Sequence, residues 1–283
     1  ILIAALFSAG NIAARERPEW RDWATGERYV LGAAYYKPQL DTTVAIGGEN
    51  GGLGAVISFE KNLKLDSRKG TGLLYGRWRP FKRHVFRVDY FDLERSSFGK
   101  ASGASLLIGD KVLDVTLPVS SFFDIKSVNF AYSFSVIMNP KHDLSLGLGL
   151  SVQQLNFGIV GNSVALPGNG GQLPLDQFID ERAELLAPVP TFNVGYRYAI
   201  ADDWMFDVNA GWFAIDLELN PNGDFGGNVF SGDTGVRWKA FKNAGLRLGY
   251  QIFDVDIDYR KRRARGVLDY RYKGPTIAFE SRF

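Results

Sequence analysis

Apolar and polar residues alternate one by one along most of this chain. The clearest stretch begins at Leu144, where leucines at every second position to residue 150 enclose Ser145, Gly147 and Gly149. The same period recurs in stretches that begin near residues 128, 192, 206 and 246. Successive side chains of a β-strand point to opposite faces, so the pattern predicts amphipathic strands with one aliphatic and one small or polar face.

Ten strands are expected from this pattern, an even number that brings both ends of the sheet to the same side. Residues 47–68 are ambiguous: Gly51–Glu60 could form a further strand, giving twelve with a partner elsewhere, or an extended loop that folds over or into the lumen. Leu175–Leu186 has helical spacing and predicts a short helix. The expected strands cover residues 28–46, 69–80, 84–95, 120–137, 143–158, 188–199, 203–218, 227–240, 244–259 and 266–283.

The connections favour a membrane barrel over a soluble sandwich. Short turns, such as Ala201–Asp203 and Lys242–Asn243, alternate with long connections at about 96–119, 159–188, 219–226 and 260–266. Outer-membrane barrels have short periplasmic turns and longer extracellular loops. Aromatic residues near the strand ends fit two interfacial girdles. These are Trp78, Trp204, Trp238 and Phe241 beside the short turns, and Tyr90, Trp212 and Tyr250 further along. The predicted fold is therefore all-β: a closed antiparallel transmembrane β-barrel.

Composition narrows the class further. Mean hydropathy is −0.10 although 46% of residues are hydrophobic, and the sequence offers no apolar run long enough for a spanning helix. The formal net charge of +2 does not indicate a nucleic-acid partner. Acidic residues take over the lipid-facing positions after Ile252, Trp212 and Tyr90, as in Asp254-Val255-Asp256, and this predicts strand extensions above the bilayer.

The first residues resemble part of a secretion signal. Ile1–Phe7 is apolar and is followed by small residues, typical of a signal-peptide core and its cleavage region. Residues 1–14 are thus expected to be a signal-peptide remnant, 15–27 a periplasmic N-terminal segment and 28–283 the barrel. An apolar segment that remains in the mature protein is the alternative.

The last strand carries Ile277, Phe279 and the terminal Phe283 on one face. It resembles the C-terminal signal that the barrel-assembly machinery recognises, which implies a Gram-negative outer-membrane protein and that machinery as a partner during biogenesis. The chain from about residue 28 also resembles a family of proteobacterial outer-membrane barrels known mainly as hypothetical proteins. The matching pieces are Tyr90-Phe91-Asp92-Leu93, Tyr132-Ser133-Phe134 and Leu268-Asp269-Tyr270-Arg271-Tyr272-Lys273-Gly274-Pro275. This resemblance implies fold and location and no substrate.

Charged residues on the polar faces of the strands are the candidate lumen lining. They could pair with one another and with Glu280 to fill a narrow barrel, or line a pore that favours anions. Basic residues outnumber acidic ones in this set, so some positive charge is expected to stay uncompensated. The set comprises Arg77, Arg87, Asp89, Arg197, Asp207, Arg237, Lys239 and Arg247.

Other candidate chemistry is sparse. His84 and His142 are expected to be solvated turn residues without catalytic partners, and neither a metal site nor any cofactor is predicted. Asp254, Asp256 and Asp258 could bind a hard cation, but pairing with the adjacent basic run is the simpler explanation. That run could instead contact lipopolysaccharide phosphates. It consists of Arg260, Lys261, Arg262, Arg263 and Arg265.

Three functions remain open at this point. The leading hypothesis is a porin-like barrel that binds a small solute or allows its restricted permeation. The second is a structural or surface-interaction barrel with a plugged lumen, and the third is an outer-membrane hydrolase.

Overall fold

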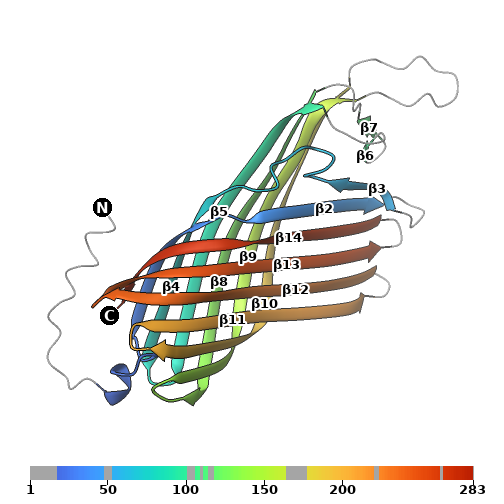
Figure 1. The fold of residues 1–283 in the computed structure, drawn as a ribbon. Coiled ribbons are helices and arrows are strands. Elements are labelled where there is room, and N and C mark those ends of the chain that lie inside the picture. The colour runs from blue at the N-terminus through green and yellow to red at the C-terminus, as the bar shows by residue number, and fades with distance from the viewer. Residues whose placement is uncertain are drawn as a thin grey trace, which may run out of the picture.

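The computed structural model describes residues 18–47, 53–100, 106–108, 111–113, 118–163, 177–219, 223–261 and 264–282. Within them, ten strands close into an antiparallel barrel (Figure 1). They are β1 (Tyr29–Tyr36), β4 (Thr71–Phe81), β5 (His84–Lys100), β8 (Pro118–Met138), β9 (His142–Ser163), β10 (Gln177–Ala201), β11 (Trp204–Leu219), β12 (Gly223–Phe241), β13 (Ala244–Lys261) and β14 (Ala264–Arg282). The prediction of an all-β, ten-stranded barrel is confirmed.

The first and last strands close the barrel. β1 pairs with β4 from Tyr29↔Trp78 onward, and with β14 from Val30↔Arg282 onward. Every other neighbouring pair is also antiparallel, and tight turns join several of these pairs at one end, as at Phe81↔His84 and Phe241↔Ala244. Closure leaves no free edge in the lower barrel, as a membrane-embedded sheet requires.

The ambiguous stretch 47–68 contains one short strand and a loop. β2 (Gln39–Gly47) follows β1 in the chain and pairs with the next part of β14, and β3 (Leu53–Ser58) pairs with β2. After β3, residues 59–70, here called the inner loop, place Phe59, Leu63 and Leu65 inside the barrel, each at most 5% exposed. The structure thus contains both alternatives, with the barrel count remaining at ten.

The short helix predicted from Leu175–Leu186 is wrong for the described part of that stretch. Residues from Gln177 onward belong to β10 and pair with β9 from Gln177↔Ser163 without interruption. Pairing with a long neighbour outweighs the local apolar spacing, which by itself cannot separate a short helix from a strand. The long connections are shorter than expected for the same reason, because β5, β8, β9, β12 and β13 extend into them. The connection 96–119 also contains a hairpin of β6 (Leu106–Ile108) and β7 (Lys111–Leu113).

The apolar face of the strands points outward in the lower half of the barrel and inward in the upper half. In the lower half, apolar side chains point outward: Leu146, Leu148 and Leu150 are 48%, 60% and 44% exposed. In the upper half the inward positions are apolar, as at Phe253 and Val255, while Asp254 and Asp256 lie outside. The β13–β14 register runs unbroken through this change, so the strands continue in phase as extensions above the apolar band.

The upper barrel divides into two arms. β10 pairs with β11 only as far as Phe192↔Trp212, although each continues beyond that point along its other neighbour. On the opposite side, β4 pairs with β5 only as far as Leu73↔Phe91. Figure 1 shows β8 and β9 rising away from β12, β13 and β14 at this end. The first arm comprises β5 and β8–β10, and the second comprises β11–β14 with β2 and β3.

Two prolines explain why β10 and β11 separate. Ala199 donates its backbone N–H to Lys141 O (2.8 Å) on the β9 side, so even-numbered residues of β10 face β11. Pro188 and Pro190 are even-numbered and lack an N–H, so they remove the two donors that would extend the ladder beyond Phe192.

An apolar core fills the space between the arms. It includes Tyr36, Phe91 and Tyr272 around the start of the arms, and Phe59 of the inner loop against Phe123 (5.2 Å between ring centroids). This core seals the outer half of the barrel, whereas the polar lumen lies below it.

Candidate functional site in the barrel lumen

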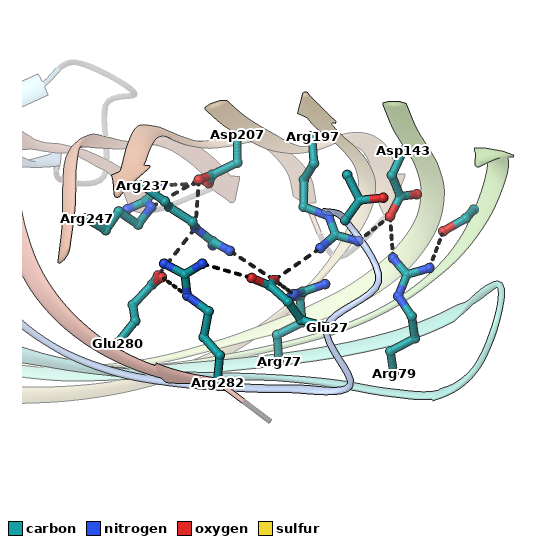
Figure 2. Close-up of polar contacts among 12 residues, drawn as sticks. Glu27, Arg77, Arg79, Asp143, Arg197, Asp207, Arg237, Arg247, Glu280 and Arg282 are labelled. Carbon is teal, nitrogen blue, oxygen red and sulfur yellow. Dashed lines mark hydrogen bonds and ion pairs between the residues drawn. The ribbon is translucent and has the colours of Figure 1, made fainter. Parts of the chain in front are cut away.

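A layer of arginines crosses the periplasmic half of the lumen (Figure 2). Strand alternation places each of them inside, and each is less than 9% exposed. They come from β4, β10, β12, β13 and β14, so the layer spans the barrel from side to side. The layer consists of Arg77, Arg79, Arg197, Arg237, Arg247 and Arg282.

Glu27 enters this layer from the segment that precedes β1. Its carboxylate pairs with Arg77, accepts from Arg282 Nη1 (3.1 Å), and lies 3.8 Å from Arg197 Nη1 and 4.0 Å from Arg237 Nη1 (Figure 2). Burial alone would raise the pKa of the Glu27 carboxyl, but these four arginines lower it below its ordinary value. The side chain is therefore an anion at neutral pH.

Residues 18–28 form a cap over the periplasmic end of the barrel. Trp20 is buried within a single 3₁₀ turn, Glu19–Arg21, and Arg79 N donates to Arg28 O (2.8 Å). A Cβ at Gly26 would lie 1.9 Å from Trp20 O, so glycine is needed where the segment folds back on itself. This fold directs the next residue, Glu27, into the lumen.

Two aspartates and a glutamate of the barrel wall hold the remaining arginines. Asp143 pairs with both Arg79 and Arg197. Asp207 lies 2.9 Å from Arg237 Nε and 2.9 Å from Arg247 Nη2. Buried charges persist only when they are paired and hydrogen-bonded in this way.

Glu280 completes the layer on β14. It accepts from the Tyr75 hydroxyl (2.6 Å), and its carboxylate lies 3.3 Å from Arg237 Nε. Arg247 also donates to Asp233 Oδ2 (2.8 Å). Among the described residues of the layer and the cavity above it, arginines number seven and carboxylates six, a formal charge of +1. They are Arg77, Arg79, Arg87, Arg197, Arg237, Arg247 and Arg282, with Glu27, Asp89, Asp143, Asp207, Asp233 and Glu280.

A cavity of about 130 Å³ lies directly on the arginine layer. Arg77, Arg197, Arg237 and Arg247 form its floor, and Phe253 and Leu73 belong to its apolar upper part. Its walls carry short amide and hydroxyl side chains that can both donate and accept hydrogen bonds. These include Asn129, Ser133, Ser151, Thr191, Asn193 and Asn209. The chamber can hold several waters or a small polar solute.

The inner loop is anchored in the apolar core of the outer half of the barrel. Glu60 of this loop accepts from Arg95 Nη1 (2.5 Å) on the first arm and from Thr42 N (2.9 Å) on the second. Arg95 also donates to Thr42 Oγ1 (2.9 Å), and it is 1% exposed. One carboxylate therefore ties the loop to both arms, as Glu27 ties the periplasmic cap to the barrel.

Seven of the eight residues assigned to the lumen from sequence line the cavity: Arg77, Arg87, Asp89, Arg197, Asp207, Arg237 and Arg247. The eighth, Lys239, has the same strand phase but lies exposed beside the β12–β13 turn. Ile277 and Phe279 point outward, 52% and 55% exposed, and Phe283 lies outside the described residues.

Residues outside the lumen have other partners. His84 and His142 face outward, with a ring nitrogen 2.9 Å from the Tyr132 hydroxyl and 2.8 Å from the Tyr196 hydroxyl. They therefore join the periplasmic aromatic girdle. Asp254 pairs with Arg271 of β14 (Nε at 2.8 Å). Within the described part of the chain, no group of His, Asp and Glu has the arrangement of a metal site.

The basic run Arg260–Arg265 surrounds the β13–β14 turn. Arg260 and Arg265 are backbone partners in the ladder, and Lys261 pairs with Ala264. Arg262 and Arg263 lie outside the described residues.

Four residues of the arginine layer were missed by the sequence analysis as lumen residues: Glu27, Arg79, Asp143 and Arg282, whereas Glu280 was named there as a pairing partner. The two-residue period could have found three of them, since Arg79 follows Arg77 on one face, Asp143 precedes Ser145 on the polar face of β9, and Arg282 follows Glu280. Glu27 lies in a segment without periodicity, and only the folded cap brings it inside.

Comparison with known proteins identifies the architecture. No protein-family model and no curated protein matches the sequence. Among solved structures, the outer membrane protease OmpT of Escherichia coli superimposes with a TM-score of 0.56 at 10% identity, over 90% of this chain and 97% of that one. A Pseudomonas aeruginosa FadL homologue (TM-score 0.37, 11% identity, 92% and 91% covered) and Neisserial surface protein A (0.33, 10%, 90% and 97%) are more distant.

The described part of the chain contains no helix long and apolar enough to span a membrane. At 10% identity the likeness to OmpT shows the fold alone. With its closed antiparallel sheet, outward apolar band and polar lumen, the chain is an integral β-barrel of the bacterial outer membrane.

Proposed function

We propose that this barrel binds a small anionic solute in its lumen and allows only restricted passage across the outer membrane. The observation that carries the proposal is the chamber itself, a polar cavity that lies on a layer of buried arginines. Guanidinium groups match carboxylate and phosphate oxygens in geometry and charge. The hydroxyl and amide walls add hydrogen bonds to a polar solute.

The two ends of the chamber support restricted rather than open passage. The cap places Glu27 across the periplasmic end, and the inner loop places Phe59 and Glu60 across the outer end. A water-filled pore would need both segments to move. In each segment one carboxylate pairs with arginine, Glu27 in the cap and Glu60 in the inner loop, and the apolar core between the arms would also have to rearrange.

Single-channel recording in planar bilayers tests this function. We expect the wild-type barrel to show small or infrequent conductance steps, with reversal potentials in a salt gradient that favour anions. Arg247→Glu should weaken that preference, because it reverses a charge on the chamber floor. A cation-selective wild type would contradict the assignment of these arginines to the permeation path.

A plugged structural or surface-interaction barrel is the second candidate. The apolar core between the arms favours it, since this core fills the outer half of the lumen as the core of a soluble domain would. This function predicts no conductance and no solute binding in either protein, and Arg247→Glu would then only lower the unfolding temperature.

We assign no hydrolytic role, because both histidines face outward in the aromatic girdle and away from the chamber. Contact of the basic run at 260–265 with lipopolysaccharide phosphates, and recognition of Phe283 by the assembly machinery, are further proposals. Deletion of Phe283 should reduce the amount of folded barrel in outer-membrane fractions.

A further inference from the structure

Glu27 occupies a site that the barrel wall builds without it. Its carboxylate is contributed by the cap, whereas the four arginines that face it belong to β4, β10, β12 and β14. Asp143, Asp207 and Glu280, by contrast, are part of the strands. Removal of the cap would therefore take away one carboxylate and leave its arginines in place.

The arginines around Glu27 have more donors than this carboxylate can accept. Among the described residues, Arg77 Nε and Nη1 and Arg282 Nη2 are buried without a hydrogen-bond acceptor. A buried guanidinium N–H without an acceptor is costly, so these donors favour a ligand that offers more oxygens than one glutamate does. Arg77 also contributes to the floor of the chamber.

We propose that the arginine ring of Arg77, Arg197, Arg237 and Arg282 is a binding site for a small hydroxylated carboxylate, and that Glu27 holds this site as the chain's own competing ligand. The proposal rests on the solute-binding function above and names its solute class. The carboxylate replaces Glu27 on the ring, while its hydroxyl groups reach the walls at Asn193 and Thr191.

The cap is held in a way that permits this exchange. Besides Glu27, its contacts with the barrel include Arg79 N to Arg28 O (2.8 Å), Thr25 Oγ1 to Asn139 O (3.4 Å) and Lys82 Nζ over the Trp23 ring (4.9 Å). The barrel ladder closes through β1 and β14 and does not need the cap. Glu27 can leave the ring while the sheet stays intact.

Calorimetric titration of the folded barrel in detergent micelles tests the competition, with gluconate as the probe and glucose as its uncharged counterpart. Glu27→Gln should bind gluconate at least about tenfold more tightly than the wild type, within the usual range of coupling between two ligands. Glu60→Gln is the matched control, because it removes the carboxylate that ties the inner loop to the two arms and does not touch the arginine ring. It should leave gluconate affinity unchanged, and glucose should show no gain in any variant.

The proposal is overturned if Glu27→Gln and wild type bind gluconate equally, or if glucose gains as much as gluconate. Heat-modifiable migration on gels verifies that each variant is folded. If Glu27→Gln fails to fold, a second measurement decides.

The chain contains no cysteine, so Glu27→Cys carries a unique thiol. We expect a sulfonatoethyl methanethiosulfonate to modify it faster than the trimethylammonioethyl analogue, because the ring attracts the anion. Asp22→Cys, exposed in the same segment, supplies the reference ratio of the two rates. An equal ratio of the two modification rates at positions 27 and 22 would contradict the assignment of the arginine ring as an anion-binding site.

These outcomes separate the proposal from the function on which it rests. If Glu27→Gln gains gluconate affinity but neither protein conducts, the site is real and the passage function fails. If wild type conducts anions but Glu27→Gln gains no affinity, passage stands and the competition by Glu27 is wrong.

Discussion

Phe192 of β10 and Trp212 of β11 form the outermost paired rung between their strands, and both rings lie on the outer surface, 63% and 53% exposed. This rung therefore coincides with the upper aromatic girdle. The strands pair fully where lipid surrounds them and separate only above it. The division into two arms is thus compatible with the rule that no open sheet edge faces hydrocarbon.

Restoring the missing donors of β10 should lengthen this ladder. Pro188→Val combined with Pro190→Val supplies two N–H groups that face β11. We expect amide hydrogen exchange in residues 213–219 of β11 to slow by roughly fivefold, because a typical hydrogen bond contributes about 1 kcal/mol. Pro140→Val, at the short β8–β9 turn, is the control and should leave that exchange unchanged. Unaltered exchange in the double variant would mean that the prolines do not cause the separation.

The Arg95–Glu60 pair should stabilise the inner loop strongly. Arg95→Met leaves the Glu60 carboxylate with a buried charge and no arginine, which typically costs about 3–5 kcal/mol. Urea unfolding of the folded barrel in micelles measures the loss. Arg271→Met breaks the exposed pair with Asp254 and should cost only about 0–1 kcal/mol. Equal losses of unfolding free energy in the two variants would argue against Glu60 as the residue that holds the inner loop in place.

The cap should loosen in acid. The folded-state pKa of Glu27 lies below its ordinary value of 4.5, so its contribution to stability is present above pH 4.5 and is lost as the pH falls through the folded pKa. Proteolysis of the cap by pepsin should therefore accelerate as the pH falls below 4.5. Glu27→Gln should be cleaved readily at every pH in this range. A wild-type cleavage rate with the pH dependence of Glu27→Gln would contradict the role of the carboxylate.

The lipid-facing band should tolerate charge according to depth. Leu148 lies in the middle of the outward row of β9, and Gln154 lies on the same face above the apolar band. Leu148→Arg should destabilise the barrel by about 2–4 kcal/mol and Gln154→Arg by about 0–1 kcal/mol. Equilibrium refolding into vesicles measures both. A larger loss for Gln154→Arg than for Leu148→Arg would contradict the assignment of Leu148 to the middle of the bilayer.

Strand phase made the lower barrel predictable, because a period of two fixes which residues face lipid and which face the lumen. Leu148 and Arg197 could be assigned to opposite sides from their positions alone. The strand number followed from the same pattern. Local pattern also misled, as at residues 177–186, where pairing with β9 determines the structure.

The contents of the lumen could be predicted only in part. Arg237 and Arg247 are identified by phase, but their sharing of Asp207 depends on barrel diameter and on side-chain reach. Glu27 could not be assigned, since nothing in the sequence before β1 shows that the segment folds back into the barrel. The separation of the arms could not be predicted from the sequence either, because it depends on which neighbouring strand the backbone of Pro188 and Pro190 faces.

The exchange of faces between the lower and upper barrel has a consequence for biogenesis. The outer half hides its aromatic and aliphatic side chains between the arms, so it can gain stability in water. The lower half exposes rows of leucine and aromatic side chains and becomes stable only in a lipid environment. The two halves of each hairpin thus mature in different solvents, and the extracellular arms could collapse before, or independently of, closure of the strands below.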